Sequence, residues 1–369
     1  MKCKILQAEL VRNLNKLQGL SERKPGLAHA ANVLLEVTSD GLQFAATDMD
    51  ITIVTRATCE VIEEGSLAIA SKQLFEIVRS LPNKEVNLST MDNYWLHIQC
   101  GRTEYKIVGL NPFDFPQLPS DHDIETNLIP AEVISRMIDR TIFCTSQDEN
   151  RKHLRGVYCE WNSETNQLRM AATDGHRLTL AEEHIENMKE QPAAIVPKKA
   201  FSELKKVLAE VDPKMPIEIG FSKKRGRIQV GDTSLSIALI EGTFPNYRRV
   251  IPTNNERILH CKRGELTAAL KRISILSKEN ENTVTLTPGE GIVSITSQNP
   301  DFGEAREDLE ALYEGPTFSA CFNARYLLDV LILHSSDDIV FELADEISPA
   351  LIKSNGDNTF LAVVMPMRP

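Results

Sequence analysis

The stretch IVPKKAFSELKKVL, residues 195–208, places a short apolar run suited to a strand directly before an amphipathic helix. The same order recurs in IASKQLFEIVRSL (69–81) and in CFNARYLLDVLIL (321–333). Phe201 has an aromatic counterpart in each of the other two stretches, at offsets of 126 and 125 residues. Self-similarity at a fixed period indicates a chain built from repeated structural units. We therefore predict three repeats of about 120 residues each, an ordinary size for a domain.

Other elements repeat around this helix. An earlier amphipathic helix is predicted in AELVRNLNKL, AEVISRMIDR and GELTAALKRI, because their apolar residues recur every three or four positions. A hairpin follows each of them, and the sequence AATD stands in two of these hairpins, 126 residues apart. The third hairpin, TLTPGEGIVSITSQN, keeps the turn but lacks AATD. The first two repeats also close alike, with DFPQLP at 114–119 and TFPNYRRVIP at 243–252.

These repeats predict an α+β fold of three similar domains, each with two helices packed on antiparallel sheets. We expect the boundaries at 1–122, 127–252 and 256–369.

The composition excludes several classes of protein. No run of about 18 apolar residues is present to span a bilayer, and the start, MKCKILQAEL, is too polar for a secretory signal, so we expect a cytoplasmic protein. The seven cysteines are scattered and never form CxxC, which predicts reduced thiols. The chain has no phosphate-binding loop, no HExxH and no ligand cluster spaced for a metal, so we predict no cofactor and no metal.

The charge of the chain is unevenly distributed. The net charge is −11, yet the six predicted helical segments hold 17 basic and 9 acidic residues; they are 8–24, 71–80, 131–140, 198–210, 262–276 and 323–336. Lysine and arginine on solvated helix faces are one explanation. The alternative is that the helices face one polyanion. Twelve helices from two copies, packed about 8–10 Å apart, would enclose a hole about 25 Å wide, which accommodates a DNA duplex with a layer of water.

Three segments carry a resemblance to a known family: ATDGHRL (172–178), FPNYRRV (244–250) and VMPMR (364–368). Over its whole length the chain resembles the bacterial DNA polymerase III beta subunits, the sliding clamps. The resemblance implies a head-to-tail dimeric ring whose helices line a central hole. It implies a clamp that encircles double-stranded DNA without sequence preference and gives the polymerase holoenzyme processivity without catalysis. The implied partners are the replicative polymerase alpha subunit, the clamp loader, and other polymerases and repair proteins with clamp-binding motifs.

The resemblance also implies a hydrophobic groove between the second and third domains that binds short peptide motifs. The matching positions are Leu154, Thr173, Gly175, His176, Arg177, Leu178, Pro245, Arg249, Val250, Val363, Val364, Met365, Pro366, Met367 and Arg368. Methionine is deformable and suits a surface that takes several partners. Arginine can bind backbone carbonyl or acidic groups of a ligand. Pro349 and Pro369 are departures that bear on which motifs the groove prefers.

Residues for contact with DNA and with a second subunit follow from the same resemblance. The DNA-binding candidates are Lys24, Lys72, Lys198, Arg151 and Lys152. The last two lie in the loop SQDENRKHL (146–154), which is more charged than the family pattern leads us to expect. At the dimer interface, Tyr105 and Ile107 on an edge strand are expected to face Ile275 and Leu276 of a second copy.

Two other functions are compatible with parts of the sequence. A hydrolase could use Thr173 as nucleophile with Asp174 and His176 as an acid–base pair. The companion segment AATDMDIT has the same frame without a histidine, which instead predicts a structural turn at Asp174 and Gly175. A monomeric adaptor that binds peptides but does not encircle DNA is the second alternative.

Overall fold

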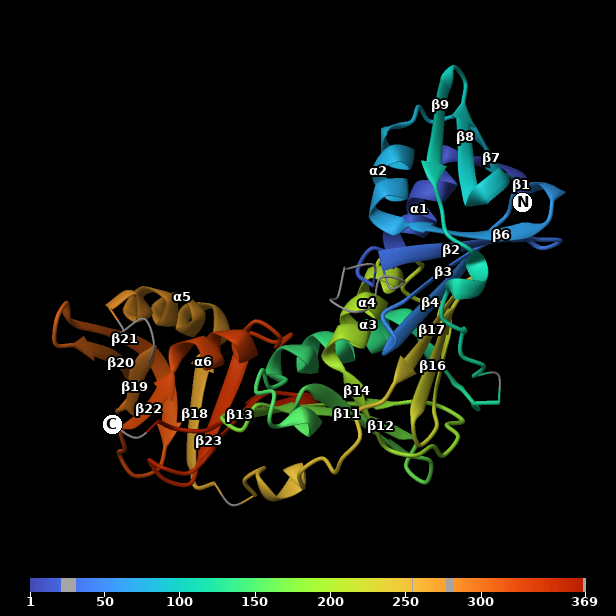
Figure 1. Cartoon of the computed structure of the whole chain (residues 1–369). Coiled ribbons are helices and arrows are strands. Elements are labelled where there is room, and N and C mark those ends of the chain that lie inside the picture. Colours follow the sequence, from blue (N-terminus) through green and yellow to red (C-terminus); the bar gives the residue numbers. More distant parts are fainter. Residues whose placement is uncertain (21–30, 122, 254, 277–281, 368–369) are drawn as a thin grey trace. The chain divides into compact units, whose positions relative to one another are not determined.

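The computed structural model describes residues 1–20, 31–121, 123–253, 255–276 and 282–367 (Figure 1). Residue contacts divide the chain into two compact units. Unit 1 comprises Met1–Glu132 and Lys199–Leu239, and unit 2 comprises Val133–Lys198 and Ile240–Pro369.

Each third of the chain runs through the same order of elements: a strand, a helix, a group of hairpin strands, a second helix and three final strands. The first third contains β1 (Lys2–Leu6), α1 (Gln7–Leu17), β2 (Asn32–Thr38), β3 (Gly41–Thr47), β4 (Ile51–Ala57), β5 (Glu60–Glu63), β6 (Gly65–Ala70), α2 (Ser71–Ser80), β7 (Glu85–Met91), β8 (Trp95–Cys100) and β9 (Thr103–Val108). The second contains β10 (Asn127–Pro130), α3 (Ala131–Thr141), β11 (Gly156–Asn162), β12 (Gln167–Thr173), β13 (Arg177–His184), β14 (Ala194–Pro197), α4 (Lys198–Leu208), β15 (Pro216–Phe221), β16 (Arg225–Val230) and β17 (Thr233–Ala238). The last contains β18 (Arg257–Lys262), α5 (Arg263–Ile273), β19 (Thr283–Pro288), β20 (Ile292–Asn299), β21 (Gly303–Glu314), β22 (Ala320–Asn323), α6 (Ala324–Leu331), β23 (Asp338–Leu343), β24 (Ala350–Ser354) and β25 (Asp357–Val364).

The predicted fold class is confirmed: three repeats, with six α-helices and antiparallel sheets in the described ranges. The second helices begin at Ser71, Lys198 and Ala324, close to the predicted offsets. The first helix was predicted over 8–24; helix α1 ends at Leu17, residues 18–20 form a turn, and 21–30 lie outside the described residues. Helix α5 ends at Ile273 and continues as a 3-10 turn rather than as an α-helix to residue 276.

Unit 1 holds two antiparallel sheets. One has the order β5-β1-β7-β8-β9, and the other has the order β10-β15-β16-β17-β4-β3-β2-β6. In the second sheet a strand of the first third, β4, pairs with the last strand of the second third, β17. We call this pairing the first junction.

Unit 2 is built on one sheet of twelve strands, in the order β14-β11-β12-β13-β25-β24-β23-β18-β21-β20-β19-β22. Here β13 of the second third pairs with β25, the last strand of the last third. We call this pairing the second junction. The middle third therefore contributes strands to both units, which is why contacts divide the chain into two units rather than three.

The interiors of both units follow the amphipathic patterns of their helices. Helix α1 packs against α2, and α5 packs against α6, with apolar faces turned to the sheets. All seven cysteines are unpaired thiols, and burial raises the pKa of Cys3, Cys144 and Cys261 to about 12. Among the described helices, none has the length and apolar character needed to cross a bilayer.

Candidate functional site

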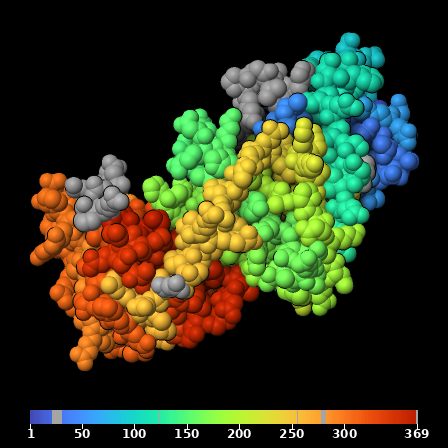
Figure 2. All heavy atoms as spheres, turned by 90° about the horizontal axis from the view of Figure 1, so that it is seen from below, coloured from blue at the N-terminus to red at the C-terminus, as the bar shows by residue number. Residues whose placement is uncertain are grey.

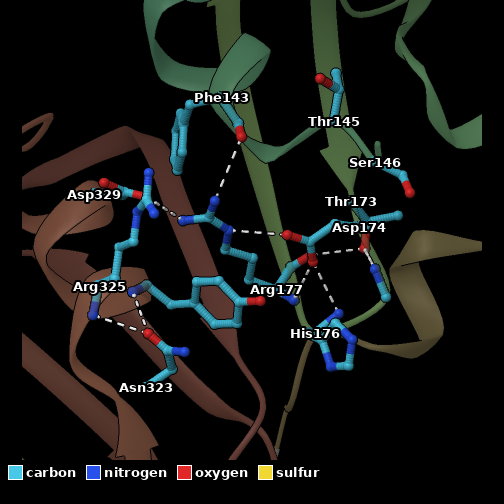
Figure 3. Close-up of polar contacts among 12 residues, drawn as sticks. Phe143, Thr145, Ser146, Thr173, Asp174, His176, Arg177, Asn323, Arg325 and Asp329 are labelled. Atoms are coloured by element: carbon cyan, nitrogen blue, oxygen red, sulfur yellow. Dashed lines mark hydrogen bonds and ion pairs between the residues drawn. The ribbon is translucent and has the colours of Figure 1, made fainter. Parts of the chain in front are cut away.

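The turn between β12 and β13 is closed by its own side chains (Figure 3). The Thr173 hydroxyl donates to the carbonyl oxygen of Arg177 at 2.6 Å. Oδ1 of Asp174 accepts from the backbone N–H groups of His176 and Arg177, at 2.9 and 3.0 Å. Gly175 sits between them with φ of +94°, a backbone region that glycine enters without strain. The predicted turn at Asp174 and Gly175 is confirmed.

The first repeat builds the same turn from AATDMDI. The Thr47 hydroxyl donates to the carbonyl oxygen of Ile51 at 3.1 Å, and Oδ1 of Asp48 accepts from the backbone N–H of Ile51 at 2.9 Å. Met49 takes the place of Gly175, with φ of +78°. Because this frame forms without a histidine, its threonine and aspartate serve the turn. The Thr173 hydroxyl donates its proton to a carbonyl oxygen and not to a base that could activate it. This arrangement does not support Thr173 as the nucleophile of a hydrolase.

Gly175 is also approached closely from outside the turn. A Cβ at this position would lie 2.8 Å from Nη1 of Arg151. The Nε of Arg151 donates to Oδ2 of Asp148 at 2.8 Å, which fixes the guanidinium above the turn. Arg151 thus lies against Gly175 in this structure, and its contact with DNA stays a prediction.

The second junction brings two of the predicted segments into register. Leu178 lies opposite Val363, and Arg177 lies opposite Val364. Successive side chains on a strand point to opposite faces of the sheet, so these two pairs face different sides. Leu178 and Val363 belong to a buried apolar cluster formed by Leu154, Ala171, Leu178, Leu180, Ile195, Phe244, Tyr247, Leu351 and Val363.

Predicted groove residues that neighbour this cluster in the sequence are exposed, and we call them its rim. His176 and Pro245 are exposed, as are Gly175 and Arg249, and Val250 is 40% exposed. Figure 2 shows that the gold segment, which follows β17 in the chain, lies at the surface. The half-buried residues Met365, Pro366 and Met367 complete the rim. We call the cluster and this rim together the second-junction surface.

The C-terminal tail is held by backbone hydrogen bonds. Met365 donates its N–H to the carbonyl oxygen of His176 at 2.9 Å, and Met367 donates to that of Cys321 at 2.7 Å. Residues nearly 200 positions apart in the sequence are thereby placed side by side. Arg368, which was also predicted to contribute, lies outside the described residues.

Arg177 and Val364, also predicted for the groove, face the helix side of the sheet, opposite to Leu178 and Val363. Val364 is buried in the core of the last third. The Arg177 guanidinium donates to Asp174 at 3.1 Å, to Asp329 at 2.7 Å and to the carbonyl oxygen of Phe143 at 3.4 Å (Figure 3). It also lies over the ring of Tyr326, 4.4 Å from the centroid. These contacts hold the Arg177 side chain against the turn, and its part in binding a peptide stays a prediction.

Several members of the cluster were not predicted. Leu180 and Leu351 follow from alternation along their strands, the signal that could have identified them. The aromatic members could not be found in this way, because they depend on a tertiary contact. Phe244 stacks on Tyr158 with ring centroids 4.9 Å apart, and Tyr247 donates its hydroxyl proton to Glu160 at 2.9 Å.

The predicted DNA-binding residues occupy different environments. Lys72 is exposed at the start of α2, and Lys152 is exposed in the 3-10 helix η5 (Lys152–Leu154). Lys198 is half-buried at the start of α4, and Lys24 lies outside the described residues.

Part of the positive charge on the helices is balanced by carboxylates on the sheets. Arg136 of α3 pairs with Glu183 at 2.7 Å, and Lys199 of α4 pairs with Asp48 at 2.6 Å. Arg272 of α5 pairs with a glutamate of β21. Internal pairing therefore accounts for some of the charge separation seen in the sequence.

The predicted dimer residues differ in exposure. Ile275 is 79% exposed, and Leu276 beside it is half-buried. Tyr105 is half-buried, whereas Ile107 is only 8% exposed, because it already packs inside unit 1.

Comparisons with known proteins give consistent matches along the chain. Family models of the DNA polymerase III beta subunit match as its N-terminal domain at residues 1–119, its central domain at 128–246 and its C-terminal domain at 248–368. A beta sliding clamp of Caulobacter vibrioides is 34% identical, with 100% of both chains covered. One of Pseudomonas aeruginosa is 31% identical, with 99% of both covered.

Solved structures agree with the sequence matches. The chain superposes on a beta sliding clamp of Caulobacter crescentus with a TM-score of 0.95, 34% identity and full coverage of both chains. It superposes on a clamp of Pseudomonas aeruginosa bound to griselimycin with a TM-score of 0.94, 30% identity and full coverage.

Proposed function

Because the chain belongs to the DNA polymerase III beta subunit family along its whole length, we infer that it is a DNA sliding clamp. It encircles duplex DNA and tethers the replicative polymerase, and it does not itself catalyse a reaction. Within the holoenzyme it is the processivity subunit, and the clamp loader opens it at the expense of ATP.

The observation that carries the ring is the way in which neighbouring thirds share strands. At each junction the last strand of one third pairs with the fourth strand of the third before it: β17 with β4, and β25 with β13. The last strand of the first third, β9, has no such partner and forms the edge of its sheet. In β21, residues 303–310 pair with β20, and β18 pairs only with the following residues. A second copy satisfies both edges if β9 pairs with β21 of its partner.

The register of this third junction follows from the first. At the first junction Ile53 of β4 pairs with Leu235 of β17. Alignment of the repeats by their strand pairings makes Ala305 the counterpart of Ile53 in β21. The same alignment makes Tyr105 the counterpart of Leu235 in β9. We therefore place Tyr105 opposite Ala305 of the partner subunit.

Charges are complementary in this register. Lys106 lies opposite Glu304 of the partner subunit, and Glu104 lies opposite Arg306 of the partner subunit. All four side chains are exposed in the single chain. Ile275 and Leu276, beyond the end of α5, then add apolar contact around Tyr105. The monomeric adaptor, which requires stable open edges on both β9 and β21, is not favoured.

The second-junction surface is proposed to receive short apolar motifs from the polymerase alpha subunit, the clamp loader, other polymerases and repair proteins. Its buried floor supplies apolar area, and the rim supplies Met365 and Met367, which adapt to different side chains. His176 and Arg249 are exposed there and can donate to carbonyl or carboxylate groups of the bound segment.

Encirclement is tested by comparing retention on circular and linear DNA. We expect the loaded protein to remain on a nicked circular plasmid and to leave it after linearisation, because topology rather than affinity retains it. Replacing Lys24, Lys72 and Lys198 by Glu should weaken loading but leave dimerisation intact. Direct binding of the unaltered protein to DNA should fall steeply as the salt concentration rises. Gel filtration of labelled protein with plasmid measures retention. Equal loss from circular and linear DNA contradicts the proposal.

A further inference from the structure

The first junction carries a polar pocket that corresponds to the second-junction surface. Its volume is about 250 Å³ and it lies wholly within unit 1. The lining residues that matter here are Thr52, Arg56, Asp121, Arg227, Ser234 and Ser236. We call it the first-junction pocket.

Strand register relates this pocket to the apolar cluster. Thr52 lies opposite Ser236 in the pairing of β4 with β17, as Leu178 lies opposite Val363 in the pairing of β13 with β25. On the neighbouring strand, Arg227 stands where Leu351 stands at the second junction. The two sites thus share one frame, and apolar side chains at the second junction are replaced by polar ones at the first.

A buried carboxylate in the pocket lacks a donor. Asp121 is 7% exposed, and its Oδ1 accepts no hydrogen bond. It follows the segment DFPQLP, just as Val250 follows TFPNYRR at the second junction. A buried polar atom without a partner costs free energy, and such an atom in a native structure is often satisfied by a bound group. The missing partner here is an N–H or O–H donor.

Two guanidinium groups in the pocket are positively charged hydrogen-bond donors. Arg56 donates from Nε to the side-chain oxygen of Gln43 at 3.2 Å, and Arg227, which is half-buried, also lines the pocket. Neither forms an ion pair with a carboxylate within the described ranges. Besides Asp121, the lining includes the carboxylate of Asp232, so the pocket offers acceptors for N–H groups together with donors for an anionic group.

We propose that the first-junction pocket binds a short acidic peptide segment of a partner protein. A backbone N–H of the segment donates to Asp121, and its carboxylate side chain accepts from Arg56 and Arg227. A peptide carries an N–H donor and a carboxylate a few bonds apart, and inorganic phosphate, which has an O–H donor beside its anionic oxygens, is the rival that the test must exclude. The volume is below the roughly 300–1,000 Å³ of pockets for drug-sized molecules, so only a residue or two can enter. The proposal rests on the proposed function in one respect: the equivalent surface at the second junction takes an extended peptide.

The test uses the full-length protein, labelled with ¹⁵N, and the blocked tripeptide acetyl-Gly-Glu-Gly-amide. Acetyl-Gly-Gln-Gly-amide is the matched probe without the charge, and inorganic phosphate is the probe for a simple anion. We expect the Glu peptide to shift the amide signals of Thr52, Ser234 and Ser236 in a saturable manner. Arg227→Gln should weaken its binding by roughly tenfold or more, since a charge-assisted hydrogen bond is lost. Asp121→Ala should weaken it as well, while removing an unpaired buried group and so leaving the protein folded.

Separate outcomes decide between this proposal and its rivals. Absence of saturable shifts means that the pocket holds only water, and unchanged binding in both variants places the peptide elsewhere; each overturns the proposal. Saturation by phosphate with the same affinity makes it an anion site and overturns it too. A short apolar clamp-binding peptide serves as the control, because its binding to the second junction should be the same in Arg227→Gln, Asp121→Ala and the unaltered protein. If the unaltered protein fails to bind the apolar peptide but still binds the Glu peptide, the proposed function is contradicted and the pocket is not.

Discussion

At the scale of one residue, the surroundings of His334 in the last third of the chain disfavour protonation of its imidazole ring. The side chain is 2% exposed, its Nδ1 lies 2.8 Å from the hydroxyl of Ser354, and its ring packs on Phe360. Burial, and then the positive charge of Arg140, lower the pKa of His334 to about 4. The charged form is therefore disfavoured in the folded protein and allowed in the unfolded chain.

We predict a loss of stability as the pH falls from about 6.5 to about 4. In this window the unfolded chain binds a proton at His334 that the folded protein does not, so the free energy of unfolding falls by up to roughly 3 kcal/mol. Above pH 6.5 both states are neutral and the effect is absent. Urea unfolding at pH 7.5 and pH 5, followed by Trp161 fluorescence in a Trp95→Phe background, measures it in unit 2. His334→Asn should reduce the difference between the two pH values, and an unchanged difference would assign the effect to other groups.

The tail after β25 carries the prediction at the scale of one element. Deleting Met365 to Pro369 leaves β25 paired with both β13 and β24, so the protein should fold and dimerise. It should lose measurable binding to a short apolar clamp-binding peptide, because the two methionines and Pro366 leave the rim. Fluorescence anisotropy measures this. Wild-type affinity in this deletion variant would refute the site.

The helices and strands also show which features of the structure could be predicted from the sequence and which could not. The repeats predicted six helices because periodic apolar patterns are local, and the AATD turn was predicted because two copies differed only in residues the turn does not need. The sheet face to which each strand residue points was harder to predict from the sequence. Arg177 and Val364 stand beside Leu178 and Val363 in the sequence, but a shift of one residue along a strand reverses the face. The acceptors that hold Arg177, on α6 and in the turn after α3, come together only in the folded protein.

At the scale of the whole molecule, the charge pattern on β9 and β21 makes the dimer testable. Lys106→Glu should place like charges opposite Glu304 of the partner subunit at both interfaces and raise the dimer dissociation constant roughly tenfold at low salt. Adding Glu304→Lys to the same chain should restore dimerisation, and high salt should narrow the difference. Sedimentation velocity measures the equilibrium, with Ile275→Asp combined with Leu276→Asp as a monomer reference. A double variant no better than the single one would disprove this register.

The shared geometry of the three strand pairings has a kinetic consequence. At β4–β17 and β13–β25 the two strands belong to one chain, so after separating they meet again at an effective concentration in the millimolar range. The pairing of β9 with β21 has no such tether, and once both of its copies part, its return depends on the concentration of free protein. Three joints of similar design therefore differ in reversibility. Because the proposed β9–β21 pairing joins two separate chains, it is the place where the closed circle of strands can open and close again.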